Sequence, residues 1–171
     1  GAYIEATAKP LDEYLKAYQE QRLKLLAKGK PSEYYPETVA TTWNMSFEAV
    51  KEECLAGSEL LRLFSYLAPD DIPLMYLVKN TDHLPDSVAS VLQGEDERDE
   101  SLAALRRYSL ISRIGNKISV HRLVQLVTRD NLALQEREEW AGAAVKLLND
   151  VFPEDHLDNV QVWSECSVLL P

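Results

Sequence analysis

The sequence predicts a mainly α protein that contains one small β-hairpin. Apolar residues recur at three- and four-residue spacing along most of the chain, proline and glycine interrupt the resulting helices, and the period changes to two at one place. With 171 residues, of which 46% are hydrophobic, the chain can bury a core. We expect one compact domain or two small ones.

Residues 1–54 are predicted to form a helical subdomain. A helix is expected after Pro10, because proline suits a first helical turn, and Gly29 and Pro31 should end it. Tyr34-Tyr35-Pro36 predicts an extended connection. The next helix carries one apolar stripe, formed by Val39, Trp43, Phe47 and Val50. The first residues are typical of a helix end, so we interpret the chain as a piece of a longer protein.

Residues 55–132 contain a mixed pattern. A strongly apolar helix over 60–67 should end at Ala68-Pro69, and a short helix should restart at Ile72-Pro73-Leu74. The spacing predicts one or two helical turns near 88–92, a solvated loop over 94–100, and renewed helical spacing from Leu102.

A hairpin follows, with strands over 110–114 and 117–120. They flank Gly115-Asn116, a dipeptide suited to a two-residue turn because both residues tolerate positive φ. His121 then opens another helix. Because helix, short helix, helix and hairpin follow in this order, residues 55–132 are predicted to form a winged-helix domain.

Residues 133–171 are acidic and are predicted to form linker helices. One apolar face includes Trp140, Leu147 and Val151 and should end at Pro153; a second includes Val160, Trp163, Cys166 and Leu170. The predicted fold class is therefore mainly α: a helical subdomain, a winged-helix domain with one small β-hairpin, and C-terminal linker helices.

The net charge of −10 disfavours nucleic acid and anionic membranes as partners. Two distant cysteines, Cys54 and Cys166, indicate neither a disulfide framework nor a zinc site. No apolar run is long enough to span a membrane, and no signal peptide is evident. These features predict a cytoplasmic location.

No catalytic or metal-binding constellation is evident in the sequence. Neither G-x-x-x-x-G-K-[ST] nor G-x-G-x-x-G is present, and the histidines His83, His121 and His156 lack ligand spacing. The tryptophans Trp43, Trp140 and Trp163 occupy core-like helical positions, where packing is the expected role. We predict no catalytic residue, no metal site and no cofactor bound by the chain alone.

Several stretches resemble a known family in both order and spacing. Leu11-Asp12-Glu13-Tyr14-Leu15, Thr38 through Trp43, Ala68-Pro69-Asp70-Asp71-Ile72-Pro73, Arg107 through Ile111 and Ser119 through Gln125 carry the resemblance, with the closing Leu169-Leu170-Pro171. Together they resemble the region that follows the nucleotide-binding domain in NB-ARC proteins of the STAND class. The fungal and bacterial members that continue into tetratricopeptide repeats are the most similar.

The resemblance implies a regulatory module of a nucleotide switch. In that family the module folds back on the nucleotide-binding domain, and a histidine after the wing hairpin reaches the β-phosphate of ADP. The matching residue here is His121, so it is the cofactor-binding residue that the resemblance implies. Without the resemblance, the residues favour an ordinary hairpin-end or helix-cap histidine at this position. ADP or ATP with Mg would be bound by the parent protein, a slow ATPase switch. Its role would be signal transduction, as in innate immunity.

The resemblance also names partners. These are the preceding nucleotide-binding domain and the following repeats of the same chain, and the parent would oligomerise on activation. Neither nucleic acid nor membrane is expected as a partner. Plant and animal members commonly read Met-His-Asp at the histidine, whereas Arg122 stands at the third position here. A contribution from that aspartate is therefore not expected.

Three other functions remain open from the residues alone. A winged-helix transcription regulator would use Arg98, Arg106, Arg107 and Arg113 near the groove-binding helix, although the acidic run over 95–100 disfavours it. A helical adaptor would belong to a parent without phosphate-binding motifs. An independent enzyme has the least support.

Overall fold

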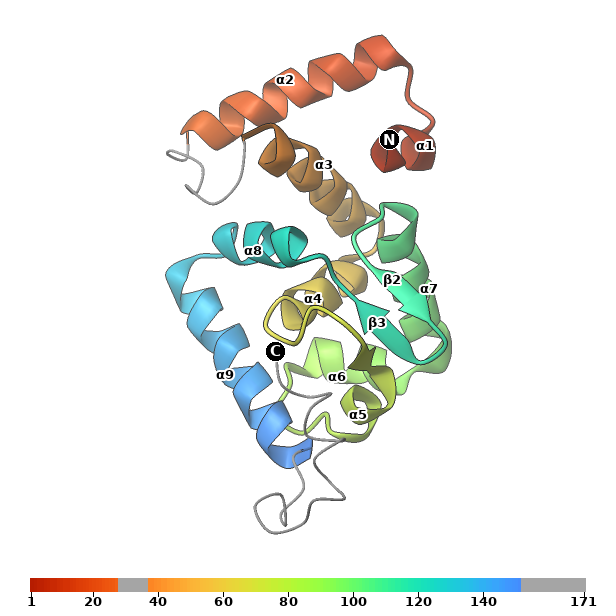
Figure 1. Cartoon of the computed structure of the whole chain (residues 1–171), viewed down its shortest axis with the longest axis vertical. Coiled ribbons are helices and arrows are strands. Elements are labelled where there is room, and N and C mark those ends of the chain that lie inside the picture. The colour runs from red at the N-terminus through yellow and green to blue at the C-terminus, as the bar shows by residue number, and fades with distance from the viewer. Residues whose placement is uncertain (28–36, 152–171) are drawn as a thin grey trace.

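A computed structural model describes residues 1–27 and 37–151 of the chain. Within this part the protein is mainly α, with nine helices and one small antiparallel sheet of three strands. The first three helices, α1 (Ala2–Thr7), α2 (Leu11–Ala27) and α3 (Glu37–Glu53), lie at one end of the molecule (Figure 1). Ala8, at φ 51°, ends α1, and α2 packs along α3.

The middle of the chain has the winged-helix arrangement. It consists of α4 (Leu55–Phe64), β1 (Ile72–Pro73), α5 (Leu74–Lys79), α6 (Asp86–Gln93), α7 (Glu95–Arg107), β2 (Ser112–Ile114) and β3 (Lys117–Ser119). The strand order is β1-β3-β2, and α4 packs against both α6 and α7. The fold class predicted from the sequence is therefore confirmed.

The predicted hairpin is confirmed. Ile114 pairs with Lys117, which leaves Gly115 and Asn116 as the two-residue turn. Gly115 has φ 57°, in the left-handed region that glycine adopts without a steric penalty.

The third strand was not predicted. Ile72 pairs with Ile118 and Pro73 with Lys117, so the expected short helix begins at Leu74 instead of Ile72. Because proline lacks an N–H, it is tolerated on an edge strand such as β1. A two-residue strand that pairs with a segment distant in the sequence has no local pattern from which it could be predicted.

The prediction of a solvated loop over 94–100 is wrong. Only Gly94 lies outside a helix there, and α7 begins at Glu95. Glu95, Asp96 and Glu97 occupy its first turn, where acidic side chains are stabilised by the helix dipole. The charged run is thus exposed to solvent but helical.

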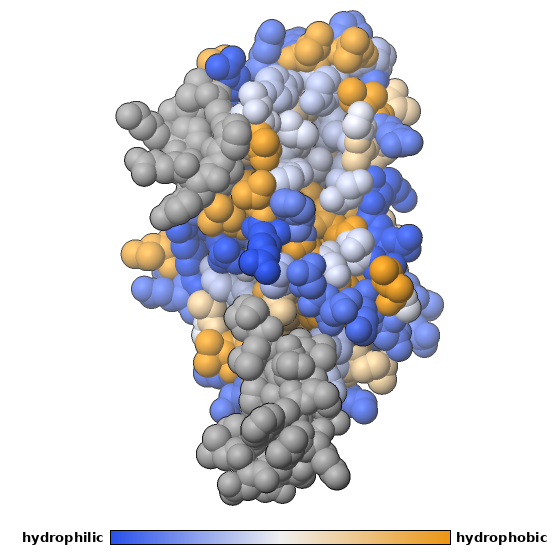
Figure 2. Space-filling view, viewed as in Figure 1, coloured by the Kyte–Doolittle hydropathy of each residue, from blue (hydrophilic) through white to orange (hydrophobic). Residues whose placement is uncertain are grey.

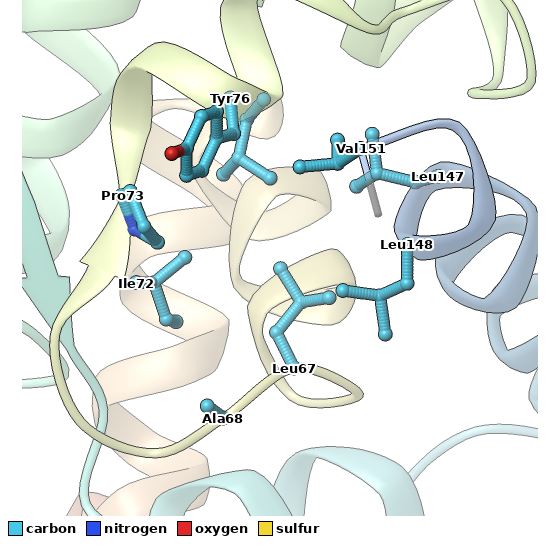
Figure 3. A pocket seen from close by; sticks show the side chains of 9 residues that line it. Leu67, Ala68, Ile72, Pro73, Tyr76, Leu147, Leu148 and Val151 are labelled. Atoms are coloured by element: carbon cyan, nitrogen blue, oxygen red, sulfur yellow. The ribbon is translucent and has the colours of Figure 1, made fainter. Parts of the chain in front are cut away.

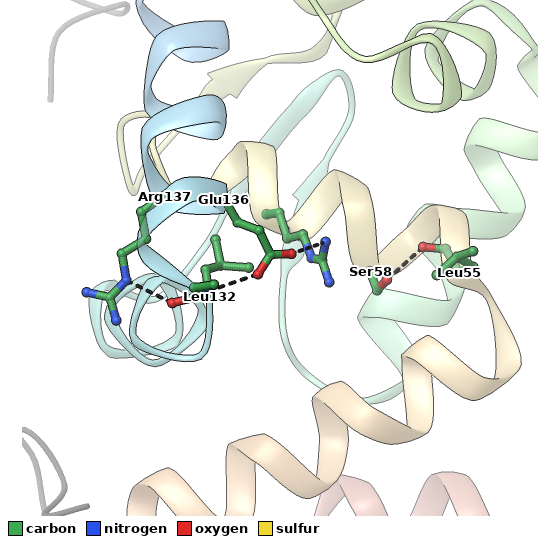
Figure 4. A network of polar contacts seen from close by, with 7 residues as sticks. Leu55, Ser58, Leu132, Glu136 and Arg137 are labelled. Atoms are coloured by element: carbon green, nitrogen blue, oxygen red, sulfur yellow. Dashed lines mark hydrogen bonds and ion pairs between the residues drawn. The ribbon is translucent and has the colours of Figure 1, made fainter. Parts of the chain in front are cut away.

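Helix α9 (Leu134–Val151) packs against the winged helix. Arg62 on α4 forms an ion pair of 3.4 Å with Glu136 (Figure 4). The other carboxylate oxygen of Glu136 accepts the Ala133 N–H at 2.9 Å, which satisfies a donor at the start of the helix. The linker predicted from the sequence is thus attached to the winged helix over residues 134–151.

One continuous hydrophobic core includes residues from all three predicted segments. It contains Tyr3 and Val50, the fully buried side chains of α4, and Trp140 and Leu147 of α9. Apolar side chains also reach the surface over α2, where Leu11, Leu15 and Leu23 are exposed (Figure 2).

Several predictions lie outside the described residues. They concern the extended connection at 34–36, the final helix over 160–170, and the side chains of His156, Trp163 and Cys166. Among the helices of the described part, none is long and apolar enough to cross a membrane.

Candidate functional site

His121 lies between the β2–β3 hairpin, which is the wing of the winged helix, and the next helix. Strand β3 ends at Ser119, Val120 is buried, and His121 is the exposed N-cap of α8 (Arg122–Asp130). Its Nδ1 accepts the Leu123 N–H at 3.1 Å. A ring nitrogen that accepts carries no proton, so the neutral imidazole has its proton on Nε2. His121 can therefore donate one hydrogen bond from Nε2 to a ligand outside the chain.

The start of α8 strengthens this site electrostatically. The first N–H groups of a helix lack intrahelical partners, and the helix dipole is positive there. The Leu123 N–H is used by His121, whereas Arg122 is exposed beside it. The combination of a ring N–H, a guanidinium and a helix N-terminus favours an anion.

Trp43 of α3 packs against the imidazole. The two ring centroids are 5.8 Å apart and the planes are inclined by 45°. From the sequence, Trp43 was expected only in the core; it is half-buried and contacts both the core and His121. Sequence reasoning missed this pair because no local pattern links positions so far apart.

Polar contacts hold α8 against α4. The Gln125 amide donates to the carbonyls of Phe64 and Leu67, at 2.9 and 3.0 Å. Arg129 donates to the Ser65 carbonyl and lies over the Tyr66 ring. The helix that carries His121 is therefore attached to the centre of the winged helix.

The arginines considered for DNA binding are mostly engaged within the protein. Arg98 donates to the Leu92 carbonyl at 2.6 Å, Arg107 pairs with Glu53, and Arg113 pairs with Asp99 at 2.6 Å. The exposed first turns of α7 are acidic. Because phosphate contacts require positive charge, this arrangement does not favour DNA as a ligand.

Among the residues that the structure describes, contacts shift the pKa values of Asp99, Tyr108 and Tyr66. The hydrogen bond from Arg113 lowers the pKa of Asp99. Burial raises the pKa of Tyr108, and a hydrogen bond to Glu53 raises it further; burial also raises the pKa of Tyr66. Each shift follows from a structural contact within the protein.

The other candidate residues are not gathered around His121. The Nε2 atom of His83 lies 3.3 Å from a carboxylate oxygen of Asp150, and the Cys54 thiol accepts the Gly57 N–H at 3.3 Å. In the described part of the chain, no group of three or more His, Cys, Asp or Glu side chains could hold a metal ion.

An apolar pocket lies between α9 and the β1–α5 region. Its lining residues, drawn in Figure 3, include Leu67, Ile72, Tyr76, Leu148 and Val151. Among the described residues, the side chains that line it are apolar apart from the Tyr76 hydroxyl.

These observations define the class of protein: a mainly helical protein built around a winged helix with a small three-strand sheet. The chain belongs to the family described as Domain of unknown function (DUF7779), whose model matches residues 45–137. The match begins in α3 and ends in α9, so it includes the winged helix, Gln125 and His121. No curated protein and no solved structure matches the chain.

Proposed function

We propose that this chain is a non-catalytic regulatory module of an NB-ARC nucleotide switch. It packs on the nucleotide-binding domain that precedes it, and His121 donates to the β-phosphate of bound ADP. Mg and the nucleotide are bound by that preceding domain. The parent protein signals in the cytoplasm, and tetratricopeptide repeats follow the module.

The observation that carries the proposal is the state of the His121 ring. With Nδ1 accepting from Leu123, the proton on Nε2 is the donor that a phosphate oxygen requires. The side chain is exposed at a helix N-terminus, where the helix dipole favours a phosphate. Arg122 adds a positive charge where plant and animal NB-ARC proteins commonly have aspartate.

The attachment of α8 to α4 connects the proposed His121–phosphate contact to the rest of the module. A phosphate bound by His121 favours the closed arrangement because α8 is joined to α4 by Gln125 and Arg129. A hydrogen bond to a charged group contributes about 1.5–3 kcal/mol, which changes a closed-to-open ratio by about 10- to 100-fold. Replacing ADP by ATP removes this contact and releases the module.

The test is ADP release from the parent protein. His121→Ala should increase the ADP off-rate by about tenfold or more, because one charge-assisted hydrogen bond is lost. His83→Ala, which removes an exposed histidine elsewhere, is the matched control and should leave the off-rate unchanged. An unchanged off-rate in His121→Ala, or a parent gene without a P-loop before this region, would contradict the proposal.

A further inference from the structure

Trp43 and Asn44 are neighbours on α3, and each contacts a residue that caps α8. The Trp43 ring packs on His121, the N-cap, and the Asn44 side chain accepts a hydrogen bond from Asn131, the C-cap. Asn44 is buried. Helix α3, in the segment predicted as the helical subdomain, therefore contacts both ends of the helix that carries the candidate site.

Trp43 has a defined environment of its own. Its side chain packs with Leu123 and Leu126 against a small cluster formed by Ala40 and Val127. It also packs against the main core. Since these neighbours lie on α3 and α8, the indole is placed by the contact between the two helices.

We propose that Trp43 is a positioning residue for His121. The indole restricts the imidazole so that Nδ1 stays bonded to the Leu123 N–H and Nε2–H keeps one direction. This inference rests on the proposed function, because the direction of Nε2–H matters only if a phosphate is its acceptor. It adds that phosphate recognition needs α3 as well as the wing.

The physical reason is conformational entropy. An exposed histidine otherwise rotates about two side-chain torsions and exchanges its ring proton between both nitrogens. A ring whose orientation is already restricted loses less conformational entropy when the ligand binds, and this strengthens binding. The hydrogen bond to Leu123 fixes one edge of the His121 ring, and packing against Trp43 restricts its face.

The first experiment uses the chain alone and measures the imidazole ¹⁵N resonances of His121 by NMR. The wild type should show one dominant neutral tautomer, with the proton on Nε2. Trp43→Leu should give a mixture of tautomers, while Trp43→Phe, which keeps an aromatic face, should retain most of the wild-type state. Leu126→Ala is the matched control, because it removes packing from the same cluster but leaves the Trp43 ring in place; the His121 tautomer should stay as in the wild type.

A purely structural role for Trp43 predicts a different pattern. If Trp43→Leu leaves the wild-type tautomer, or if Leu126→Ala disturbs it as much, the proposal is overturned. Should the leucine variant fail to fold, Trp43→Met supplies a flexible, unbranched apolar side chain that adapts to gaps in a core, again without an aromatic face, and provides the same comparison with Trp43→Phe.

The second experiment separates this inference from the proposed function. In the parent protein, Trp43→Leu should speed ADP release by about three- to tenfold, the effect of an unrestricted side chain. In the His121→Ala background the same change should add almost nothing, because both residues act through one contact. If His121→Ala speeds release but Trp43→Leu does not, positioning fails and the proposed function stands. If Trp43→Leu alters the tautomer while neither variant changes release, the proposed function fails.

Discussion

The side-chain amide of Gln125 on α8 donates to the backbone carbonyl of Phe64, the last residue of α4, at 2.9 Å. It also donates to the Leu67 carbonyl at 3.0 Å. The Phe64 carbonyl also accepts the Leu67 N–H at 3.3 Å, so the buried side chain of Gln125 is its second donor. One glutamine thus attaches the helix that His121 caps to the end of α4.

Replacing this glutamine should destabilise the fold. Gln125→Leu removes a donor from two carbonyls at a buried position, although the Phe64 carbonyl keeps the Leu67 N–H, so we expect a loss of about 1–3 kcal/mol in the free energy of unfolding. Urea denaturation followed by circular dichroism measures it. Gln135→Leu changes an exposed glutamine on α9 and should alter stability by less than about 0.5 kcal/mol. Equal effects of the two changes would contradict this role for Gln125.

The ion pair between the wing and α7 predicts a pH dependence at Asp99. The hydrogen bond from Arg113 holds the pKa of Asp99 below its ordinary value of 3.8. Because the pKa of Asp99 is lower in the folded state than in the unfolded state, the ionised carboxylate stabilises the fold at pH values above the unfolded-state pKa. This stabilisation is lost as the pH falls through the folded-state pKa. Arg113→Gln should therefore raise the pKa of Asp99, as measured by ¹³C NMR titration of its carboxyl group.

Arg106→Gln provides the control for that titration. Arg106 lies on the same helix, but it is not among the groups that shift the pKa of Asp99. Its removal should leave the titration of Asp99 unchanged. If Arg113→Gln also leaves the pKa of Asp99 unchanged, the Asp99–Arg113 contact does not determine that pKa.

Two glycines should respond in opposite directions to alanine. Gly115 has positive φ in the hairpin turn, so Gly115→Ala should cost about 1 kcal/mol. Gly142 lies inside α9, and a Cβ there would meet nothing within 4 Å. Gly142→Ala should therefore stabilise the protein by about 0.5–1 kcal/mol. Thermal unfolding of the two variants beside the wild type tests both signs, and a stabilising Gly115→Ala would contradict the turn geometry.

The chain alone should bind ADP and ATP weakly. It lacks a phosphate-binding loop, and a single imidazole donor beside a helix N-terminus gives few contacts. We expect a Kd of about 1 mM or weaker, measured by isothermal titration calorimetry. The His121→Ala chain serves as the reference for any residual heat. Micromolar affinity of the unmodified chain would contradict a function that depends on a separate nucleotide-binding domain.

The sequence by itself determined the fold class and the position of the candidate residue. Helical spacing predicted α2, α3 and α4, and Gly115-Asn116 predicted the hairpin, because these signals depend on residues near one another in the chain. The same local order placed His121 directly after the wing, at the start of a helix. Its phosphate role came from the resemblance and stays a prediction.

Only the tertiary structure decided how these elements meet. The pairing of β1 with β3, the attachment of α9 through Glu136, and the contact of Trp43 with His121 join segments that are far apart in the sequence. The start of α7 was wrongly predicted as a loop for another reason. A run of acidic residues has the composition of a loop, yet acidic side chains are stabilised at the positive end of a helix. Local patterns specify single elements, whereas long-range packing fixes which side chains share a site.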